Sequence, residues 1–354
     1  LKEAFHFNLG YEKYSFIKAI KTSDSGTLLL GKGTDFEQSK PYKYFLVKLK
    51  NDYSVDWKKE FNWESESDIP LNIQEIPGDG YFVVQWHKIL KIDYQGNSSN
   101  FYEVPVSYKV NFLRAIETDL NGNYLIVGES HRNWPVPPIC IEYFLVKVDG
   151  SGSEIWHKFG GNTIVNYPAG IFRINNDRYV ILGCAESTHS VSYDNNHDWI
   201  TNTWMLNVDG EGHELSEKIF TNNYNADNVL INYSVENDGS IVMAGAVAGF
   251  LTGAYNSKVR ISKINIQVYL ESNGVFCRIN CFDKIPNSGG YLVLASDDRG
   301  ASVSEFSNSG DLNRIVKLIG YPSGLLVKYN SLGYYEYITA DGYLIIFNRD
   351  GYHE

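Results

Sequence analysis

The sequence predicts an all-β fold: a seven-bladed β-propeller built from four-stranded antiparallel blades. An alternating strand, a tight turn and an apolar strand recur along the 354 residues. These turns follow one another at a mean spacing of about 51 residues, so about seven repeats fill the chain. The hydrophobic fraction of 43% is sufficient for buried cores, and no segment shows sustained helical periodicity.

The first repeated phrase predicts the first two strands of each blade. Its third copy reads FLRAIETDLNGNYLIVGES from Phe112. Glycine in the turn can adopt the positive φ that two-residue hairpins require. The strand after the turn is almost entirely apolar, as is typical of strands buried between stacked sheets. The turn positions are Gly26, Gly80, Gly122, Asp177, Gly239, Gly289 and Gly333.

A second phrase predicts the third and fourth strands. It reads YFLVKLKNDYSVDWKKEF from Tyr44 and YFLVKVDGSGSEIWHKFGG from Tyr143, with weaker copies later. Aspartate favours such turns because its carboxylate accepts hydrogen bonds from nearby backbone groups, and glycine takes the strained position. The Asp and Gly pairs are Asp93 with Gly96, Asp149 with Gly152, and Asp209 with Gly212.

The seventh repeat contains three strands and ends at Glu354. The N-terminal EAFHFNLG from Glu3 is similar to EIWHKFGG from Glu154, a fourth strand. We therefore expect residues 1–10 to form the outer strand of the last blade and leave no open sheet edge there. The predicted organisation is a single propeller domain, 1–354, with the repeats running from 11 to 354.

The phrase LVKVDGSGSEIW resembles the D-x-x-G-x-x-x-W blade motif of the PQQ-like (quinoprotein alcohol dehydrogenase-like) repeat superfamily. The fuller pattern is similar to that of uncharacterised bacterial secreted and lipoprotein propellers. This resemblance implies export, with an extracellular, periplasmic or cell-surface location after removal of a signal or lipid anchor. Repeats four to seven lack the tryptophan, and the superfamily's quinone-binding residues find no match here. No cofactor is therefore expected.

The excess of acidic over basic residues limits the classes of binding partner that we expect. The chain has 31 Lys and Arg against 42 Asp and Glu, a net charge of −11. A nucleic-acid binder needs a basic surface for phosphates, so we expect no nucleic-acid partner. No run of 18 apolar residues is present, so no transmembrane segment is expected. We expect a monomer.

Long connections between the second and third strands predict where a ligand binds. They begin near Lys32, Glu129, Glu186 and Ala246, and connections above about 12 residues are usually functional or disordered. In a propeller these connections open on one face, together with those between blades. Aromatic rings there can stack on sugars or peptide side chains while polar groups fix orientation. The candidate ligand-binding residues are Trp63, His131, Arg132, Trp134, His189, Tyr193, Asp194, His197, Asp198, Trp199 and Tyr255.

The leading hypothesis is an exported, non-enzymatic propeller that binds a glycan or a protein through these loops. The plainer interpretation is that Trp134 and Trp199 only hold their loops on the blades. Asp194 and Asp198 lack the order of a calcium loop, and His189 and His197 are a weak zinc signal, so no metal is expected. Two alternatives stay open. One is a glycoside hydrolase, lyase or quinoprotein-like oxidoreductase at the channel mouth, and the other is a structural module of a surface assembly.

Overall fold

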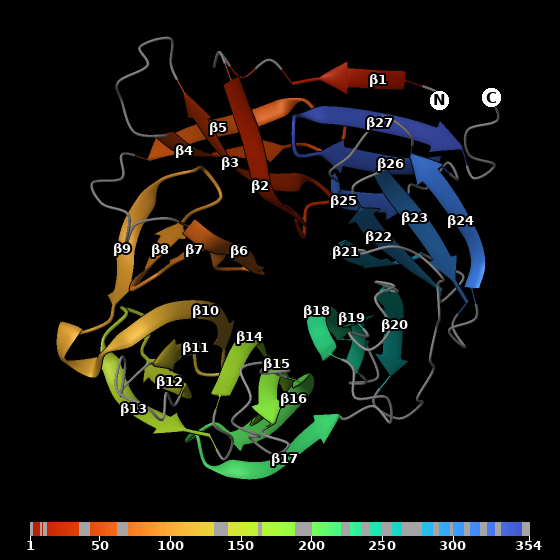
Figure 1. The fold of residues 1–354 in the computed structure, drawn as a ribbon. Helices are drawn as coiled ribbons and strands as arrows, with labels where there is room; N and C mark the ends of the chain where they lie inside the picture. Colours follow the sequence, from red (N-terminus) through yellow and green to blue (C-terminus); the bar gives the residue numbers. More distant parts are fainter. Residues whose placement is uncertain are drawn as a thin grey trace. The chain divides into compact units, whose positions relative to one another are not determined.

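The computed structural model describes residues 3–7, 9, 13–34, 43–61, 70–130, 141–161, 165–187, 200–220, 227–235, 241–248, 257–263, 278–285, 290–297, 300–307, 312–318, 324–329 and 334–348. The described strands form seven antiparallel sheets, six with four strands and one with three (Figure 1). In each sheet, consecutive strands are neighbours. This arrangement confirms the predicted fold class, and the sheets are called blades 1 to 7 in chain order.

The chain divides into two compact units. Unit 1 comprises Leu1–Phe61 and Ile231–Glu354, and unit 2 comprises Asn62–Leu230. The expectation of a single domain stays a prediction.

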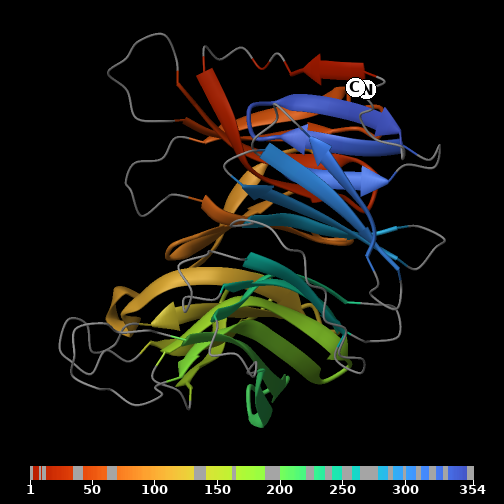
Figure 2. The ribbon, with the colours of Figure 1, turned by 45° about the vertical axis from the view of Figure 1, so that its right-hand side comes forward.

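Unit 2 holds blades 2, 3 and 4, whose strands lie side by side in both ribbon views (Figures 1 and 2). Blade 2 consists of β6 (Pro70–Ile76), β7 (Gly80–Gln85), β8 (Lys88–Ile92) and β9 (Ser98–Glu103). Blade 3 consists of β10 (Val110–Thr118), β11 (Tyr124–Ser130), β12 (Glu142–Val148) and β13 (Glu154–Gly160). Blade 4 consists of β14 (Val165–Asn175), β15 (Arg178–Ser187), β16 (Ile200–Asp209) and β17 (Glu214–Phe220). A short 3-10 helix, η2 (Val106–Tyr108), precedes β10.

Unit 1 holds blades 1, 6 and 7 and most of blade 5. Blade 1 consists of β2 (Lys13–Lys21), β3 (Thr27–Thr34), β4 (Lys43–Leu49) and β5 (Val55–Phe61). Blade 5 consists of β18 (Asp227–Val235), which spans the boundary between the units, β19 (Ile241–Ala248) and β20 (Ser257–Lys263). Its expected fourth strand falls within 264–277, outside the described residues. Blade 6 consists of β21 (Arg278–Lys284), β22 (Tyr291–Asp297), β23 (Gly300–Phe306) and β24 (Leu312–Leu318).

The N-terminal strand completes the last blade, as the sequence predicts. Blade 7 consists of β25 (Gly324–Tyr329), β26 (Tyr334–Thr339), β27 (Tyr343–Asn348) and β1 (Glu3–His6). β1 pairs antiparallel with β27, and the two strands lie side by side in Figure 1. This pairing covers the outer edge of β27, whose backbone groups would otherwise be open to another chain.

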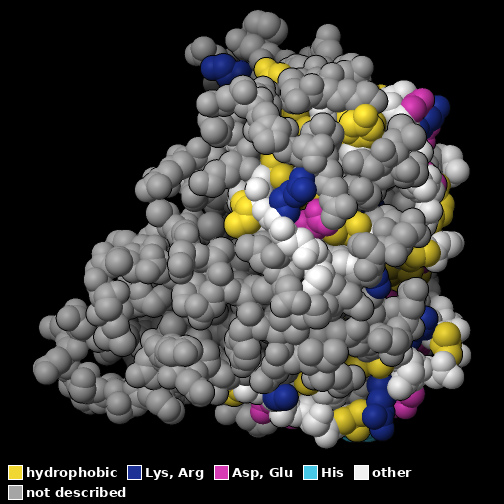
Figure 3. Space-filling view, turned by 90° about the vertical axis from the view of Figure 1, so that its right-hand side faces the viewer, with side chains coloured by type: hydrophobic (Ala, Val, Ile, Leu, Met, Phe, Trp, Pro, Cys, Tyr) yellow, Lys and Arg dark blue, Asp and Glu magenta, His cyan; other side chains and the backbone are white. Residues whose placement is uncertain are grey.

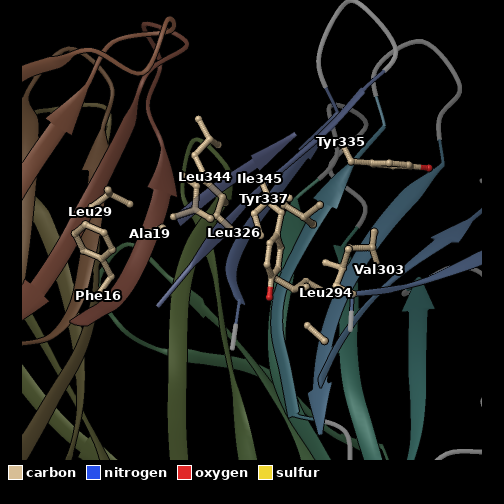
Figure 4. Close-up of a cluster of buried hydrophobic side chains, with 14 of the residues drawn as sticks. Phe16, Ala19, Leu29, Leu294, Val303, Leu326, Tyr335, Tyr337, Leu344 and Ile345 are labelled. Atoms are coloured by element: carbon tan, nitrogen blue, oxygen red, sulfur yellow. The ribbon is translucent and has the colours of Figure 1, made fainter. Parts of the chain in front are cut away.

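The hydrophobic cores lie between neighbouring blades. In unit 1, side chains of blades 1, 6 and 7 form one cluster, which includes Phe16, Leu294 and Tyr337 (Figure 4). In unit 2, one cluster joins blades 2 and 3 and another joins blades 3 and 4. Three second strands, β3, β7 and β11, have buried runs on both faces, for example Leu28 to Leu30 in β3. This explains why they are apolar without alternation.

The Asp-containing turns between third and fourth strands form as predicted. The Asp149 Oδ1 accepts hydrogen bonds from the backbone N–H groups of Ser151 and Ser153, at 2.8 and 3.0 Å. Gly152 adopts a φ of +87°, which glycine tolerates best. Asp93 and Asp209 accept the same two backbone bonds in blades 2 and 4.

In one turn, the reason for the glycine differs from the prediction. In the first turn of blade 1, Ser25 takes the positive φ of +67°, and Gly26 is not among the positive-φ residues. A Cβ atom on Gly26 would overlap the Lys48 ammonium and the Leu49 carbonyl oxygen. Glycine is therefore needed at position 26 for close approach rather than for its backbone angle.

Lysines of the third strands explain the polar position in the phrase LVKL. Lys48 binds Asp24 in the first turn of blade 1, with Nζ 2.7 Å from Oδ2. Lys91 binds Asp79 in the same way in blade 2. In blade 3, Lys147 Nζ lies 3.6 Å from Asp119 Oδ2. Each pair ties the first turn of a blade to its third strand.

Candidate functional site

The eleven predicted ligand-binding residues all lie outside the described residues. Strand bounds nevertheless place the connections that carry them. Trp63 belongs to the connection between β5 and β6, and Tyr255 belongs to unit 1, between β19 and β20. The connection between β11 and β12 carries His131, Arg132 and Trp134. The connection between β15 and β16 carries His189, Tyr193, Asp194, His197, Asp198 and Trp199.

The two connections that carry most of the predicted ligand-binding residues start from one edge of unit 2. Ser130 pairs with Glu142 where β11 ends, and Ser187 pairs with Ile200 where β15 ends. The Asn166 N–H, near the start of β14, donates to the Ile141 carbonyl oxygen at 2.9 Å. This bond fixes the beginning of blade 4 to the residue that precedes β12. We call this end of blades 2 to 4 the loop-bearing edge of unit 2.

Buried polar side chains gather at the loop-bearing edge. The strand centres beneath are apolar, yet Glu129 and Ser130 at the end of β11 are almost completely buried. The Ser130 hydroxyl donates to the Lys109 carbonyl oxygen at 3.1 Å. Burying polar groups costs free energy unless they are hydrogen-bonded, so such groups are fixed in position by their partners. Other buried polar residues at this edge are Gln85, Asn166, Asn202 and Thr203.

An arginine and two aromatic rings form the most distinctive group at this edge. Arg114 Nη2 lies 3.1 Å from Glu129 Oε1. The Arg114 guanidinium also stacks over the Phe112 ring, with Cζ 5.0 Å from its centroid. The Trp86 ring packs edge-on against Phe112 at 4.9 Å between centroids. The Trp86 carbonyl oxygen accepts a hydrogen bond from the Leu113 N–H at 2.8 Å, which joins blades 2 and 3.

A second carboxylate, half-buried, lies further along β10. Burial raises the pKa of Glu117, and this effect outweighs the hydrogen bonds from the backbone N–H groups of Thr118 and Arg173. The Thr118 bond measures 2.9 Å and is local to β10, whereas the Arg173 bond, at 3.4 Å, joins β10 to β14. Glu117 therefore serves as a bond acceptor between blades 3 and 4.

No metal site emerges from the residues described. Within these ranges, no group of three or more His, Cys, Asp or Glu side chains is arranged to hold an ion. None of the described segments forms a helix with the length and apolar character needed to span a bilayer. On the face shown in Figure 3, the described Lys and Arg side chains are spread among acidic, hydrophobic and neutral ones.

Sequence reasoning did not identify Trp86, Phe112, Arg114 or Glu129 as a group. The available signal was Arg114 in FLRAIET, part of the strand predicted before the tight turn of the third repeat. The register of β10 shifts between Leu113 and Ala115. Such a bulge changes which side chains share a face of the strand, so the pattern alone could not group these residues.

Comparison with known proteins supports the fold. No protein-family model matches the sequence, and no curated protein matches it. The structure of YCF48 bound to D1 peptide is similar, with a TM-score of 0.54 and 12% identity over 98% of this chain and 95% of that one. The Neurospora crassa Pan2 WD40 domain has a TM-score of 0.54 and 10% identity, covering 97% and 93%. Kuenenia stuttgartiensis hydrazine synthase has a TM-score of 0.51 and 9% identity, covering 97% and 99%. These similarities show that the chain has a β-propeller fold.

Proposed function

We propose that this chain is an exported, non-enzymatic propeller that binds a peptide or protein ligand at the loop-bearing edge of unit 2. One observation carries the proposal. The connections 131–141 and 188–199 leave neighbouring blades at the same edge, above buried polar side chains that the blades hold in place. A rigid base with variable connections is the usual arrangement of a binding site.

The residue types in these connections favour a protein ligand. Trp134 and Trp199 offer large rings, and Arg132 offers a planar charged group. Tryptophan, tyrosine and arginine carry most of the binding energy in protein interfaces. YCF48, which is similar in fold, has a structure with a bound peptide. At 12% identity this supports the fold, and peptide binding by the present chain is our proposal.

Export and membership of the PQQ-like repeat superfamily belong to the same proposal. Both rest on the blade motif around Asp149 and Trp156. We also propose that the protein is monomeric and needs no cofactor. Detection of the protein in the extracellular or periplasmic fraction of its source, with its mass measured by light scattering, tests export and the monomer together.

The binding proposal is tested by substitution at the two tryptophans. A proteome-derived peptide array identifies ligands, and the double variant Trp134→Ala/Trp199→Ala is then measured against them. Loss of two interface anchors is expected to weaken binding at least about 30-fold. Trp57→Ala is the matched control, because Trp57 lies in β5 of unit 1. Unchanged binding by the double variant would refute this site.

The glycan alternative is distinguished by the same variants. If a glycan array gives binding that Trp134→Ala/Trp199→Ala abolishes, while no peptide binds, the ligand class is carbohydrate. Release of reducing sugar from a bound glycan would favour the hydrolase alternative, which requires two carboxylates about 5–10 Å apart.

A further inference from the structure

Arg114 is held in one position by three neighbouring groups. The Asn72 side-chain amide of β6 donates to the Arg114 carbonyl oxygen at 2.9 Å, which fixes the backbone. Glu129 receives a hydrogen bond from Nη2 at 3.1 Å, and the Arg114 Cζ lies over the Phe112 ring. The Trp86 ring in turn supports Phe112. An arginine restrained in this way loses little conformational entropy when it binds a ligand.

Among the described residues, most N–H donors of the Arg114 side chain have no hydrogen-bond acceptor. A guanidinium has five N–H donors in a planar fork. Among the described residues, one of these donors is engaged, by Glu129. The Arg114 side chain is 33% exposed, whereas that of Glu129 is 2% exposed. The buried carboxylate therefore holds one edge of the guanidinium while the rest can meet a ligand.

We propose that Arg114 binds a carboxylate of the ligand, either an acidic side chain or the C-terminus of a peptide. This inference rests on the proposed function, because it assigns the chemistry recognised at the loop-bearing edge of unit 2. Arginine matches a carboxylate with two parallel hydrogen bonds. Glu129 already balances part of the positive charge, so a singly charged carboxylate fits better than a doubly charged phosphate.

The charge of the whole protein gives this site an unusual salt dependence. With a net charge of −11, the chain repels an acidic peptide at long range. Added salt screens exposed charges beyond about 10 Å at 0.1 M, while the short hydrogen bonds at Arg114 persist. Association with an acidic peptide is therefore expected to become faster between 0.02 and 0.15 M NaCl, on the order of two-fold.

The direct test uses acetate as the probe and the intact protein. Arginine Nε–H resonances are followed by NMR with 15N-arginine labelling while sodium acetate replaces sodium chloride at constant ionic strength. The Arg114 resonance, assigned by its loss in Arg114→Lys, is expected to shift and saturate. Arg178, an exposed arginine at the first position of β15, is the internal control. Acetate is expected to bind at Arg114 at least about five-fold more tightly than at Arg178.

The two proposals fail in different ways. An Arg114 resonance that does not shift, or that shifts no more readily than that of Arg178, would overturn the carboxylate site whether or not the protein binds peptides. If acetate binds at Arg114 but Trp134→Ala/Trp199→Ala has no effect on peptide binding, the proposed function fails and the carboxylate site stands. Should Arg114→Lys not fold, conventional backbone and side-chain assignment of the native protein identifies the same resonance.

Discussion

Gln74 of β6 binds both backbone groups of Ile116 in β10. Its Nε2 donates to the Ile116 carbonyl oxygen at 2.5 Å, and its Oε1 accepts from the Ile116 N–H at 3.4 Å. Asn72 makes a similar bond to Arg114 two residues earlier. The first strands of blades 2 and 3 are thus joined by side-chain amides, which replace the backbone ladder found within a blade.

Replacing Gln74 by Glu tests this link. A carboxylate can still accept from the Ile116 N–H but has no donor for the carbonyl oxygen, which it would repel. We expect the free energy of unfolding to fall by about 1–3 kcal/mol, measured by urea denaturation. Gln95→Glu is the matched control in the same blade, because Gln95 is exposed in a turn. Equal stability of the two variants would show that the amide link contributes nothing.

Substitutions at two glycines in blade 3 can distinguish the cost of backbone strain from the cost of steric overlap. Both Gly122 and Gly152 have positive φ, of +78° and +87°. A Cβ on Gly122 meets nothing within 4 Å, whereas one on Gly152 would overlap the Phe101 carbonyl oxygen of β9. Gly122→Ala is therefore expected to cost about 1–2 kcal/mol and Gly152→Ala at least about 2 kcal/mol more. Similar melting temperatures for the two variants would contradict this close contact between blades 2 and 3.

The Lys48 and Asp24 pair predicts an asymmetric response to mutation. The Lys48 side chain is 2% exposed and that of Asp24 is 58% exposed. Asp24→Ala leaves a buried ammonium without its carboxylate, so we expect a loss of about 1–3 kcal/mol. Lys48→Met should be milder, and Asp24→Ala/Lys48→Met should recover much of the loss. Greater damage from Lys48→Met than from Asp24→Ala, in chemical denaturation, would contradict this account.

Acid should weaken the same pair. Burial alone would raise the pKa of Asp24, but hydrogen bonds from Lys48, Thr22 and the Gly26 N–H outweigh it and lower the pKa to about 2. Because the folded pKa lies below the unfolded one, this contribution is present above about pH 4 and is lost as the pH falls toward 2. Asp24→Asn should therefore flatten the decrease of the melting temperature between pH 4 and pH 2.

Lys328 predicts a gain of stability in mild alkali. Burial lowers the pKa of Lys328 to about 8, although the nearby Glu336 carboxylate opposes this. Between this pKa and the ordinary lysine value, the unfolded chain binds more protons than the folded one. Stability from this residue therefore rises with pH above 8, by about 1–2 kcal/mol at pH 9.5. Lys328→Met should remove the rise, whereas Lys50→Met, at an exposed turn, should not. A rise that persists in Lys328→Met would assign it to another group.

The repeated turns show how much of the fold could be predicted. Asp93, Asp149 and Asp209 form the predicted turns because aspartate and glycine determine this backbone shape over five residues. The likeness of the segments at Glu3 and Glu154 was sufficient to predict that β1 joins β27. Gly26 shows the limit, because the lysine that approaches it comes from a strand more than twenty residues away.

The candidate site depended on how strands pair, which the local sequence does not show. Strand bounds place the connections that carry Trp134 and Trp199, and the roles of these residues stay predictions. Arg114 and Glu129 are fifteen residues apart and meet across β10 and β11. The bulge beside Arg114 interrupts the alternation that would have indicated its neighbours.

The sequence by itself determined the number of blades, their turn chemistry and the completion of the last blade by the first strand. These features follow from local backbone preferences and a two-residue alternation, which repeat with every copy. Only the tertiary structure decided that Gln74 binds Ile116, that the buried Lys48 pairs with Asp24 and that Glu129 holds Arg114. Such contacts join strands of different blades or distant parts of one blade, and their geometry depends on strand register and packing that local sequence does not specify.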